Sequence, residues 1–318
     1  MGSHDQVDII EDTIRRHGEL LSILLIDRSR SRANKVHNIL WATDSYVGHK
    51  PKDEIIEADI TGPNRKTIQP RIAKTKDEQK ARTREKAEVF TSRTIVDQMN
   101  KQVDSSSPNW PATDSNWREY VSEPRLEITC GEAPYIVGRY NVVSGTKVLN
   151  LNDRVGFLDR KMRIVSEFCD DKASWLEWAK NAFKSSYGYE WQGDNLLLAR
   201  ENLLYSFIDY WNDKFPSDKI NLERTVSPEK MSFLNDIATI ITWNIFQMDG
   251  IKCVVPMSCK NEKIMVRPGL PIFGIPDEYA TVDCPGCRKN NLNNHNGVYV
   301  KIMDWQKNKP IRFVDLFK

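Results

Sequence analysis

In the second half of the chain, short apolar runs of strand length alternate with longer segments whose apolar residues recur at helical spacing. The short runs cover residues 126–129, 154–165, 186–191 and 243–249, and the helical segments cover 175–186, 195–211 and 234–242. Strands that alternate with helices are typical of a mainly parallel sheet with helices packed on its faces. The pattern therefore predicts an α/β core over residues 119–252.

The first 118 residues have a less regular pattern. We expect an amphipathic helix over 5–21 and two strands over 22–27 and 38–43, which would make residues 1–64 a small α+β unit. Residues 65–86 carry more basic than acidic side chains at helical spacing, so residues 65–118 are expected to form a basic helix and a linker. A solvated surface helix and a contact to a DNA backbone both explain this basic helix.

Composition limits the kinds of partner and compartment. Of the 318 residues 28% are charged, but the net charge is only +2, so global charge favours neither nucleic acid nor a membrane surface. No apolar run approaches the roughly 20 residues that a membrane-spanning helix needs. The six cysteines occur without a secretory signal, so we expect reduced thiols or metal ligands and a cytoplasmic location.

Three of the predicted strands end in residues that suit an adenosine-type ligand. The first ends at Cys130 and Gly131, followed by what we expect to be the start of a helix at 136–140, and the next two end at Glu190 and Asp249. In doubly wound sheets, ligands bind at the carboxyl ends of the strands. A glycine turn lets the backbone approach a ligand, one carboxylate can accept hydrogen bonds from ribose hydroxyls, and another can take the adenine amine. Each acid alone is also explained as a helix cap.

Four segments resemble one protein family when they are taken together and in order. They are Ala87-Glu-Val-Phe-Thr-Ser92, Leu126-Glu-Ile-Thr-Cys-Gly-Glu-Ala-Pro-Tyr135, Tyr187-Gly-Tyr-Glu190 with the helix behind it, and Asn244-Ile-Phe-Gln-Met-Asp249. This set resembles the adenine-specific (N6) DNA methyltransferases of restriction–modification systems, in particular restriction endonuclease subunit M proteins. The resemblance implies a Rossmann-like core that binds S-adenosylmethionine, and DNA as partner. The cofactor residues that it implies are Phe90, Thr91, Glu127, Cys130, Gly131, Glu190 and Asp249.

The chain departs from that family at several positions. Ala87 and Ser92 replace a glycine and a proline, and Ala133 stands where a second glycine is usual. The family's catalytic box, (Asn/Asp)-Pro-Pro-(Tyr/Phe), is absent, because no Pro-Pro dipeptide occurs in the sequence. We therefore assign no catalytic residue and expect the single chain not to methylate DNA.

Two hypotheses explain the missing box. In the first, the chain is the cofactor-binding part of a truncated or split enzyme, and a partner chain supplies the catalytic motif and target recognition. In the second, the chain is a catalytically silent DNA-binding or assembly subunit that retains the fold, for example beside a restriction subunit.

The segment 253–318 is expected to be a Cys-rich insertion followed by the last strands. Cys284-Pro-Gly-Cys287 is a Cys-x-x-Cys knuckle, which Cys259 and His295 would complete as a tetrahedral Cys₃His zinc site. Cys253 is a substitute ligand in this prediction. Free thiols are the alternative explanation, and a redox pair is less favoured because Cys-x-x-Cys redox motifs normally open a helix, whereas the residues after Cys287 are poor helix formers.

Overall fold

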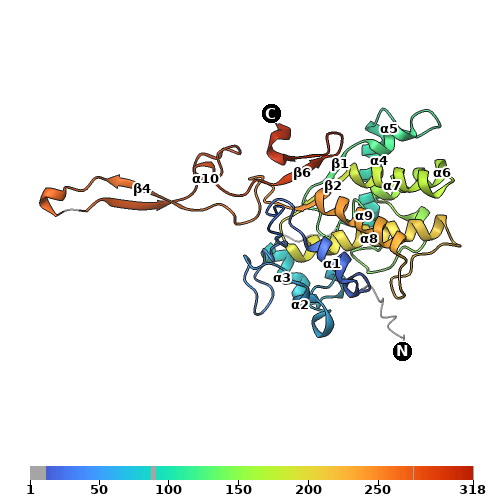
Figure 1. The fold of residues 1–318 in the computed structure, drawn as a ribbon, viewed down its shortest axis with the longest axis horizontal. Helices are drawn as coiled ribbons and strands as arrows, with labels where there is room; N and C mark the ends of the chain where they lie inside the picture. The colour runs from blue at the N-terminus through green and yellow to red at the C-terminus, as the bar shows by residue number, and fades with distance from the viewer. Residues whose placement is uncertain (1–11, 87–90, 275, 318) are drawn as a thin grey trace.

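The computed structural model describes residues 12–86, 91–274 and 276–317. It has a helix-rich body from which a two-stranded arm projects (Figure 1). The described α-helices are α1 (Gly18–Leu25), α2 (Glu57–Ile60), α3 (Lys76–Lys86), α4 (Arg93–Ser106), α5 (Trp117–Ser122), α6 (Phe157–Phe168), α7 (Lys172–Lys184), α8 (Gly193–Lys214), α9 (Pro228–Asn244) and α10 (Pro285–Lys289). The strands are β1 (Arg125–Glu127), β2 (Ser186–Glu190), β3 (Ile245–Gln247), β4 (Glu262–Arg267), β5 (Glu278–Val282), β6 (Lys301–Asp304) and β7 (Lys309–Arg312).

The body is built on a three-stranded parallel sheet in the order β1-β2-β3. Leu126 lies opposite Tyr187, and Tyr189 lies opposite Phe246, so each strand pairs with its neighbour in parallel register. Parallel strands need crossover connections, which α6 and α7 supply between β1 and β2, and α8 and α9 supply between β2 and β3. The predicted α/β class is confirmed, and the carboxyl ends of all three strands meet at one edge.

The two faces of the sheet pack against different partners. One face lies on α7, α8 and α9, and α8 is buried over almost its whole length, its polar side chains included. On the other face, Phe246 joins an apolar cluster with Val300, Ile302 and Phe313 from the C-terminal strands, and Tyr187 and Tyr189 pack against it. The sheet therefore has helices on one face and the C-terminal hairpin β6–β7 on the other.

The strand predicted over 22–27 is wrong, because this segment belongs largely to α1. Leu20, Leu21, Leu24 and Leu25 are fully buried and recur at helical spacing, and the helix packs on α9. A short apolar run of this kind cannot be assigned to strand or helix by its periodicity alone.

The strand predicted over 154–165 is also wrong, since α6 occupies most of it. Asp159 explains the start of this helix, because its carboxylate accepts hydrogen bonds from the backbone N–H groups of Gly138 (2.6 Å) and Gly156 (3.2 Å). The helix expected at 136–140 is a series of turns instead. The Arg139 carbonyl accepts the Val148 N–H at 2.8 Å and Tyr140 pairs antiparallel with Lys147, so this backbone bonds across a loop and not along a helix. The first α-helix after β1 is α6.

Among the residues that the structure describes, no helix combines the length and the apolar character that crossing a bilayer requires.

Arg200 joins the N-terminal unit to the sheet. Its side chain is fully buried on α8 and donates hydrogen bonds to the carbonyl groups of Leu24 (2.5 Å), Ile26 (3.0 Å) and Ile245 (2.8 Å). One guanidinium thus holds the end of α1 against the start of β3, which is a use of its several donors that a lysine cannot match.

We expect Arg200→Leu to lower the free energy of unfolding by about 3 kcal/mol or more, because each buried polar group left without a partner costs roughly 1–3 kcal/mol. Chemical denaturation followed by circular dichroism measures this. The matched control is Arg224→Leu at an exposed position, which should stay within about 0.5 kcal/mol of the parent. Equal stability of the two variants would contradict the role assigned to Arg200.

Candidate cofactor edge and metal centre

Gly131 and Glu190 meet at the carboxyl edge of the sheet. The chain leaves β1, turns through Gly131 at a φ of 53°, and the Gly131 N–H donates to Oε2 of Glu190 at 2.9 Å. Just before it, the Cys130 N–H donates to the carbonyl of Tyr189 at 2.8 Å, which extends the pairing of β1 with β2. The glycine turn and the acid, predicted at two different strand ends, are therefore in direct contact.

The Glu190 carboxylate is buried and bonded to backbone on both sides. Its Oε1 accepts the Gln192 N–H at 3.1 Å, at the start of α8. Burial raises the pKa of Glu190 to about 6, although the hydrogen bonds from Gln192 and Gly131 oppose this rise. At neutral pH the group is thus ionised, and it gains from any further hydrogen-bond donor that a ligand brings.

Glu127 and Cys130 are placed differently from Glu190. The buried Glu127 carboxylate accepts the backbone N–H groups of Tyr135 (3.3 Å) and Ile136 (3.2 Å), and burial raises its pKa well above the usual range. Burial likewise raises the pKa of the Cys130 thiol, so this thiol stays protonated. Both residues shape the loop after β1, and the thiol has no character of a nucleophile.

Asp249 follows β3 by two residues and lies beside the same edge. Its Oδ1 accepts the N–H groups of Ile251 (3.1 Å) and Lys252 (3.2 Å), and the Lys252 ammonium lies 3.6 Å from Oδ2. The Met248 N–H donates to the Glu190 carbonyl at 3.0 Å, which ties this strand end to the previous one. Asp249 thus follows directly after the residue whose backbone pairs with Glu190.

The two residues predicted from the Ala-Glu-Val-Phe-Thr box are not placed at this edge. Phe90 lies outside the described residues. Thr91 is half-buried just before α4, and no contact joins it to Gly131 or Glu190 in the described part of the chain.

A buried charged cluster beside Glu190 was missed by the sequence patterns. Asp194 is fully buried at the start of α8, and its Oδ2 accepts hydrogen bonds from Arg82 (2.8 Å) and from the Tyr46 hydroxyl (2.6 Å). Lys74 lies 3.6 Å from the same oxygen. Arg82 also donates to Oε1 of Gln192 at 3.2 Å, the residue whose N–H meets Glu190. The cluster is therefore continuous with the candidate cofactor edge.

The charge state of this cluster follows from its pairing. Burial alone would raise the pKa of Asp194, but the charges of Arg82 and Lys74 hold it below its usual value. The solvated helix expected over 65–86 is thus only partly right, because Arg82 of α3 faces the sheet edge. The position of Asp194, four residues after Glu190 at the start of a helix, is a signal that could have found it. In a stretch so rich in exposed charges, nothing distinguished Lys74 and Arg82.

At the root of the arm, Cys259, Cys284, Cys287 and His295 form a Cys₃His cluster that can hold a metal ion. Their ligand atoms all lie within 4.8 Å of one another, and Nδ1 of His295 lies 3.6, 3.5 and 3.7 Å from the three sulfur atoms in that order. Zinc bonds of about 2.3 Å to sulfur and about 2.0–2.1 Å to nitrogen give tetrahedral S···N edges of roughly 3.6 Å. The donor set and its spacing therefore fit a tetrahedral ion.

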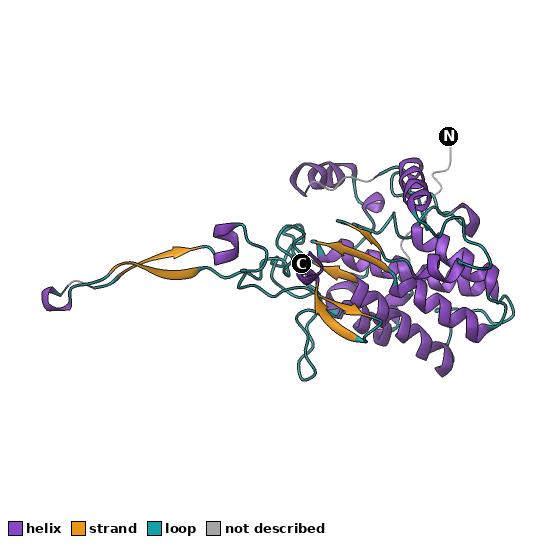
Figure 2. Ribbon diagram, turned by 90° about the horizontal axis from the view of Figure 1, so that it is seen from above, coloured by secondary structure: helices purple, strands orange, loops and turns teal. Residues whose placement is uncertain are grey.

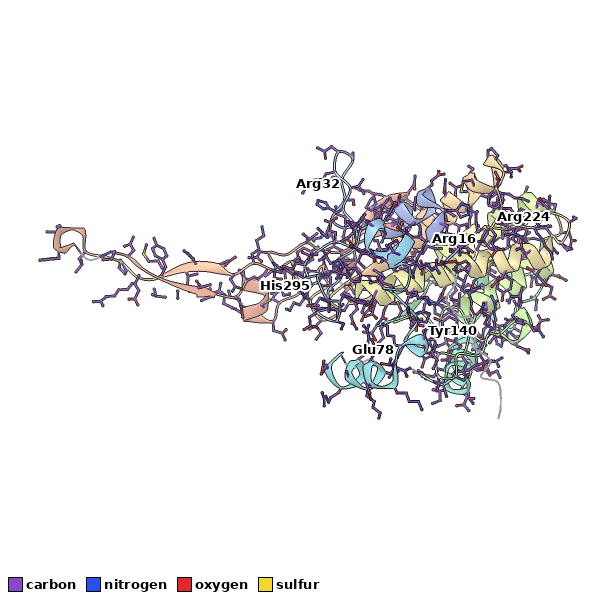
Figure 3. All side chains as sticks on the ribbon, turned by 90° about the horizontal axis from the view of Figure 1, so that it is seen from below. Arg16, Arg32, Glu78, Tyr140, Arg224 and His295 are labelled. Atoms are coloured by element: carbon purple, nitrogen blue, oxygen red, sulfur yellow. The ribbon has the colours of Figure 1, made fainter. Side chains whose placement is uncertain are left out.

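The local sequence explains how these ligands meet. Cys284 caps α10, and its sulfur accepts the Cys287 N–H at 3.4 Å. A Cβ on Gly286 would lie 2.6 Å from the His295 ring, so only glycine lets the ring approach the knuckle. The His295 N–H donates to the Tyr299 hydroxyl at 2.9 Å, which fixes the histidine backbone where the arm meets the body (Figure 3). These contacts hold the four ligands close together without the help of an ion.

The electrostatics of the cluster favour ionisation of one thiol only. Burial and the neighbouring Cys284 raise the pKa of Cys259 to about 12, and the contact with Cys284 likewise raises the pKa of Cys287. Burial opposes ionisation of Cys284, but hydrogen bonds from the backbone N–H groups of Asn296 and Cys287 lower its pKa to about 6. Metals bind the thiolate, so this shift favours ligation. Cys253 is not among the four ligands, because its side chain is buried in the apolar cluster with Phe246.

Comparison of the chain with protein-family models, with curated proteins and with solved structures finds no match.

We expect the purified chain to carry about one equivalent of tightly bound metal, which mass spectrometry of the digested protein measures directly. Cys284→Ser should lose the metal and lower the melting temperature, whereas Cys253→Ser, another buried cysteine outside the cluster, should keep it. Less than about half an equivalent in the parent, together with an unchanged melting temperature in Cys284→Ser, would refute a metal centre.

Proposed function

We propose that this chain is the S-adenosylmethionine-binding part of an adenine-specific DNA methyltransferase of a restriction–modification or phage-defence system. One observation carries the proposal: the contact between Gly131 and Glu190 at the edge where three parallel strands end, with Asp249 after the third strand. The order β1-β2-β3 is also half of the strand order 3-2-1-4-5-6 of doubly wound nucleotide-binding folds. This agreement supports a Rossmann-like core.

In this proposal the side chains divide the work of holding the cofactor. Glu190 accepts hydrogen bonds from the ribose hydroxyls with the lone pairs that its backbone donors leave, and the Gly131 turn lets the backbone approach the ligand. Asp249 accepts a hydrogen bond from the adenine amine. The ion pairs of Asp194 with Lys74 and Arg82 hold α3 and the residues just before it against the same edge, so that they form one wall of the site.

We infer that the ion of the Cys₃His cluster is zinc and that its role is structural. Three thiolates and one imidazole are a zinc donor set, and four protein ligands leave no open position for a substrate or water. The ion would fasten residues 259–295 to the body and take no part in methyl transfer.

The missing catalytic box fits a split enzyme. Among the described residues β1 pairs only with β2, so its outer edge is unpaired, and Leu126 and Ile128 are exposed beside it. An unpaired edge strand accepts a further strand through its free N–H and C=O groups. A partner chain that adds such a strand with the (Asn/Asp)-Pro-Pro-(Tyr/Phe) box would complete the site.

Calorimetric titration of the single chain with S-adenosylmethionine tests the cofactor site. We expect binding, and an affinity about 10- to 100-fold lower in Glu190→Gln, since a hydrogen bond to a charged group contributes roughly 1.5–3 kcal/mol. Glu229→Gln, at an exposed position of α9, is the matched control. A parent chain that does not bind S-adenosylmethionine would overturn the proposal, and one that then still binds DNA would instead be the silent DNA-binding subunit.

The affinity for S-adenosylmethionine should also depend on pH. Because the ribose hydroxyls donate to ionised Glu190, whose pKa is about 6, affinity should be constant above pH 7 and fall by up to tenfold per pH unit below about 6. Titrations between pH 8 and pH 5 measure this, with circular dichroism to verify folding at each pH. The dependence should disappear in Glu190→Gln, and its persistence there would assign the titration to another group.

A further inference from the structure

The arm, which comprises residues 260–283, has almost no contact with the body beyond its root. Strands β4 and β5 pair antiparallel, with Ile264 opposite Ala280 and Met265 opposite Tyr279. Figures 1 and 2, which differ by a quarter turn, both show the arm extending away from the helices. An isolated two-stranded hairpin is marginally stable in water, so an extended arm of this kind calls for a surface that covers it.

The end of the arm is apolar and exposed. Leu270, Ile272 and Phe273, here called the tip, are 52%, 94% and 75% exposed. The Gly269 N–H donates to the Asp277 carboxylate at 2.7 Å, which closes the loop behind these side chains. Apolar groups presented together on a protruding element mark an interaction site.

The charge of the arm favours a protein partner over nucleic acid. The arm has three basic residues, Lys260, Lys263 and Arg267, and four acidic residues, Glu262, Asp277, Glu278 and Asp283. Its net charge is therefore −1, whereas binding to a phosphate backbone depends on a surplus of cations. The tip itself contains no charged residue.

The body of the same chain carries an apolar groove of about 560 Å³. It lies between the amino ends of β1 and β2, the end of α7 and the C-terminal hairpin, where the sheet face is incompletely covered. Its apolar lining residues include Leu126, Tyr187, Ile302, Met303, Trp305 and Leu316. Leu126 and Leu316 are 43% and 54% exposed, and the polar lining includes Lys184 and Asp304.

We propose that two copies of this chain associate by inserting the tip of each arm into the groove of the other copy. The apolar tip matches the apolar groove, and the charges beside the tip, Arg267 and Glu278, are opposite in sign to Asp304 and Lys184 of the lining. The arm projects away from the body that bears the groove (Figure 1), so a tip cannot enter its own groove. Reciprocal insertion gives a closed twofold dimer in which the tip and the groove of each chain are both occupied.

The association leaves the cofactor edge free, because the groove lies at the opposite ends of the same strands. It therefore does not depend on whether the chain binds S-adenosylmethionine.

Size-exclusion chromatography with light scattering on the full chain tests the proposal. We expect the parent to be a dimer. The tip variant Ile272→Asp with Phe273→Asp and the groove variant Leu316→Asp should each raise the dissociation constant of the dimer about thirtyfold or more, so that both variants elute as monomers. Val47→Asp, at a fully exposed apolar position on the body, is the matched control and should remain dimeric. Unchanged circular dichroism spectra of all variants exclude unfolding as the cause, because loss of the dimer by itself lowers the melting temperature.

One mixing experiment and one charge-reversal pair make the test specific. A tip variant mixed with a groove variant retains one intact tip and one intact groove, so the mixture should form heterodimers although each variant alone is monomeric. Glu278→Lys should weaken the dimer, and Lys184→Glu in the same chain should restore it. A monomeric parent, a dimer indifferent to the tip variants, or an arm that proves necessary for DNA binding by a monomer would each overturn the proposal.

Discussion

The buried carboxylate of Glu190 is the interaction on which the sheet edge depends. It accepts the N–H of Gly131 after β1 and the N–H of Gln192 before α8, so one side chain fixes the turn after one strand and the helix after the next. Burial raises its pKa to about 6, and these backbone donors limit the rise. A buried acid that is ionised at neutral pH in this way favours a ligand that donates hydrogen bonds over one that accepts them.

The local sequence pattern predicted most of the strands and helices around the parallel sheet correctly. The helices α7, α8 and α9 were predicted because their apolar residues recur at helical spacing over many residues, and β1, β2 and β3 because each is a short apolar run between such helices. The parallel order of the strands followed from their alternation with helices. The segments of α1 and α6 were mistaken for strands, because periodicity does not separate a short apolar strand from a helix, and packing decides between them, as the packing of α1 on α9 does here.

The candidate site was predictable where its residues stand next to strand ends and not where they arrive from a distance. Glu190 and Asp249 were predicted because each follows an apolar run. The four candidate metal ligands were predicted from the Cys-x-x-Cys spacing, a further cysteine and the nearby histidine. The pairing of Arg82 with Asp194 joins residues that are 112 positions apart. No local period indicates such a contact, since the other charged side chains that are described in α3 face solvent.

The candidate metal cluster and the arm depend on each other. Between residues 260 and 294 the only described residues that are buried are Cys284 and Gly286, so this segment has no apolar core of its own. Segments too small to bury a core need a metal or a disulfide to hold one conformation, and here the four ligands join both sides of the arm's root to residues just before the last strands. A rigid root gives a two-stranded arm a defined direction, which it needs if its tip is to meet a groove on another molecule. Loss of the ion should therefore weaken association through the direction of the arm, even though no metal ligand lies at the tip or in the groove.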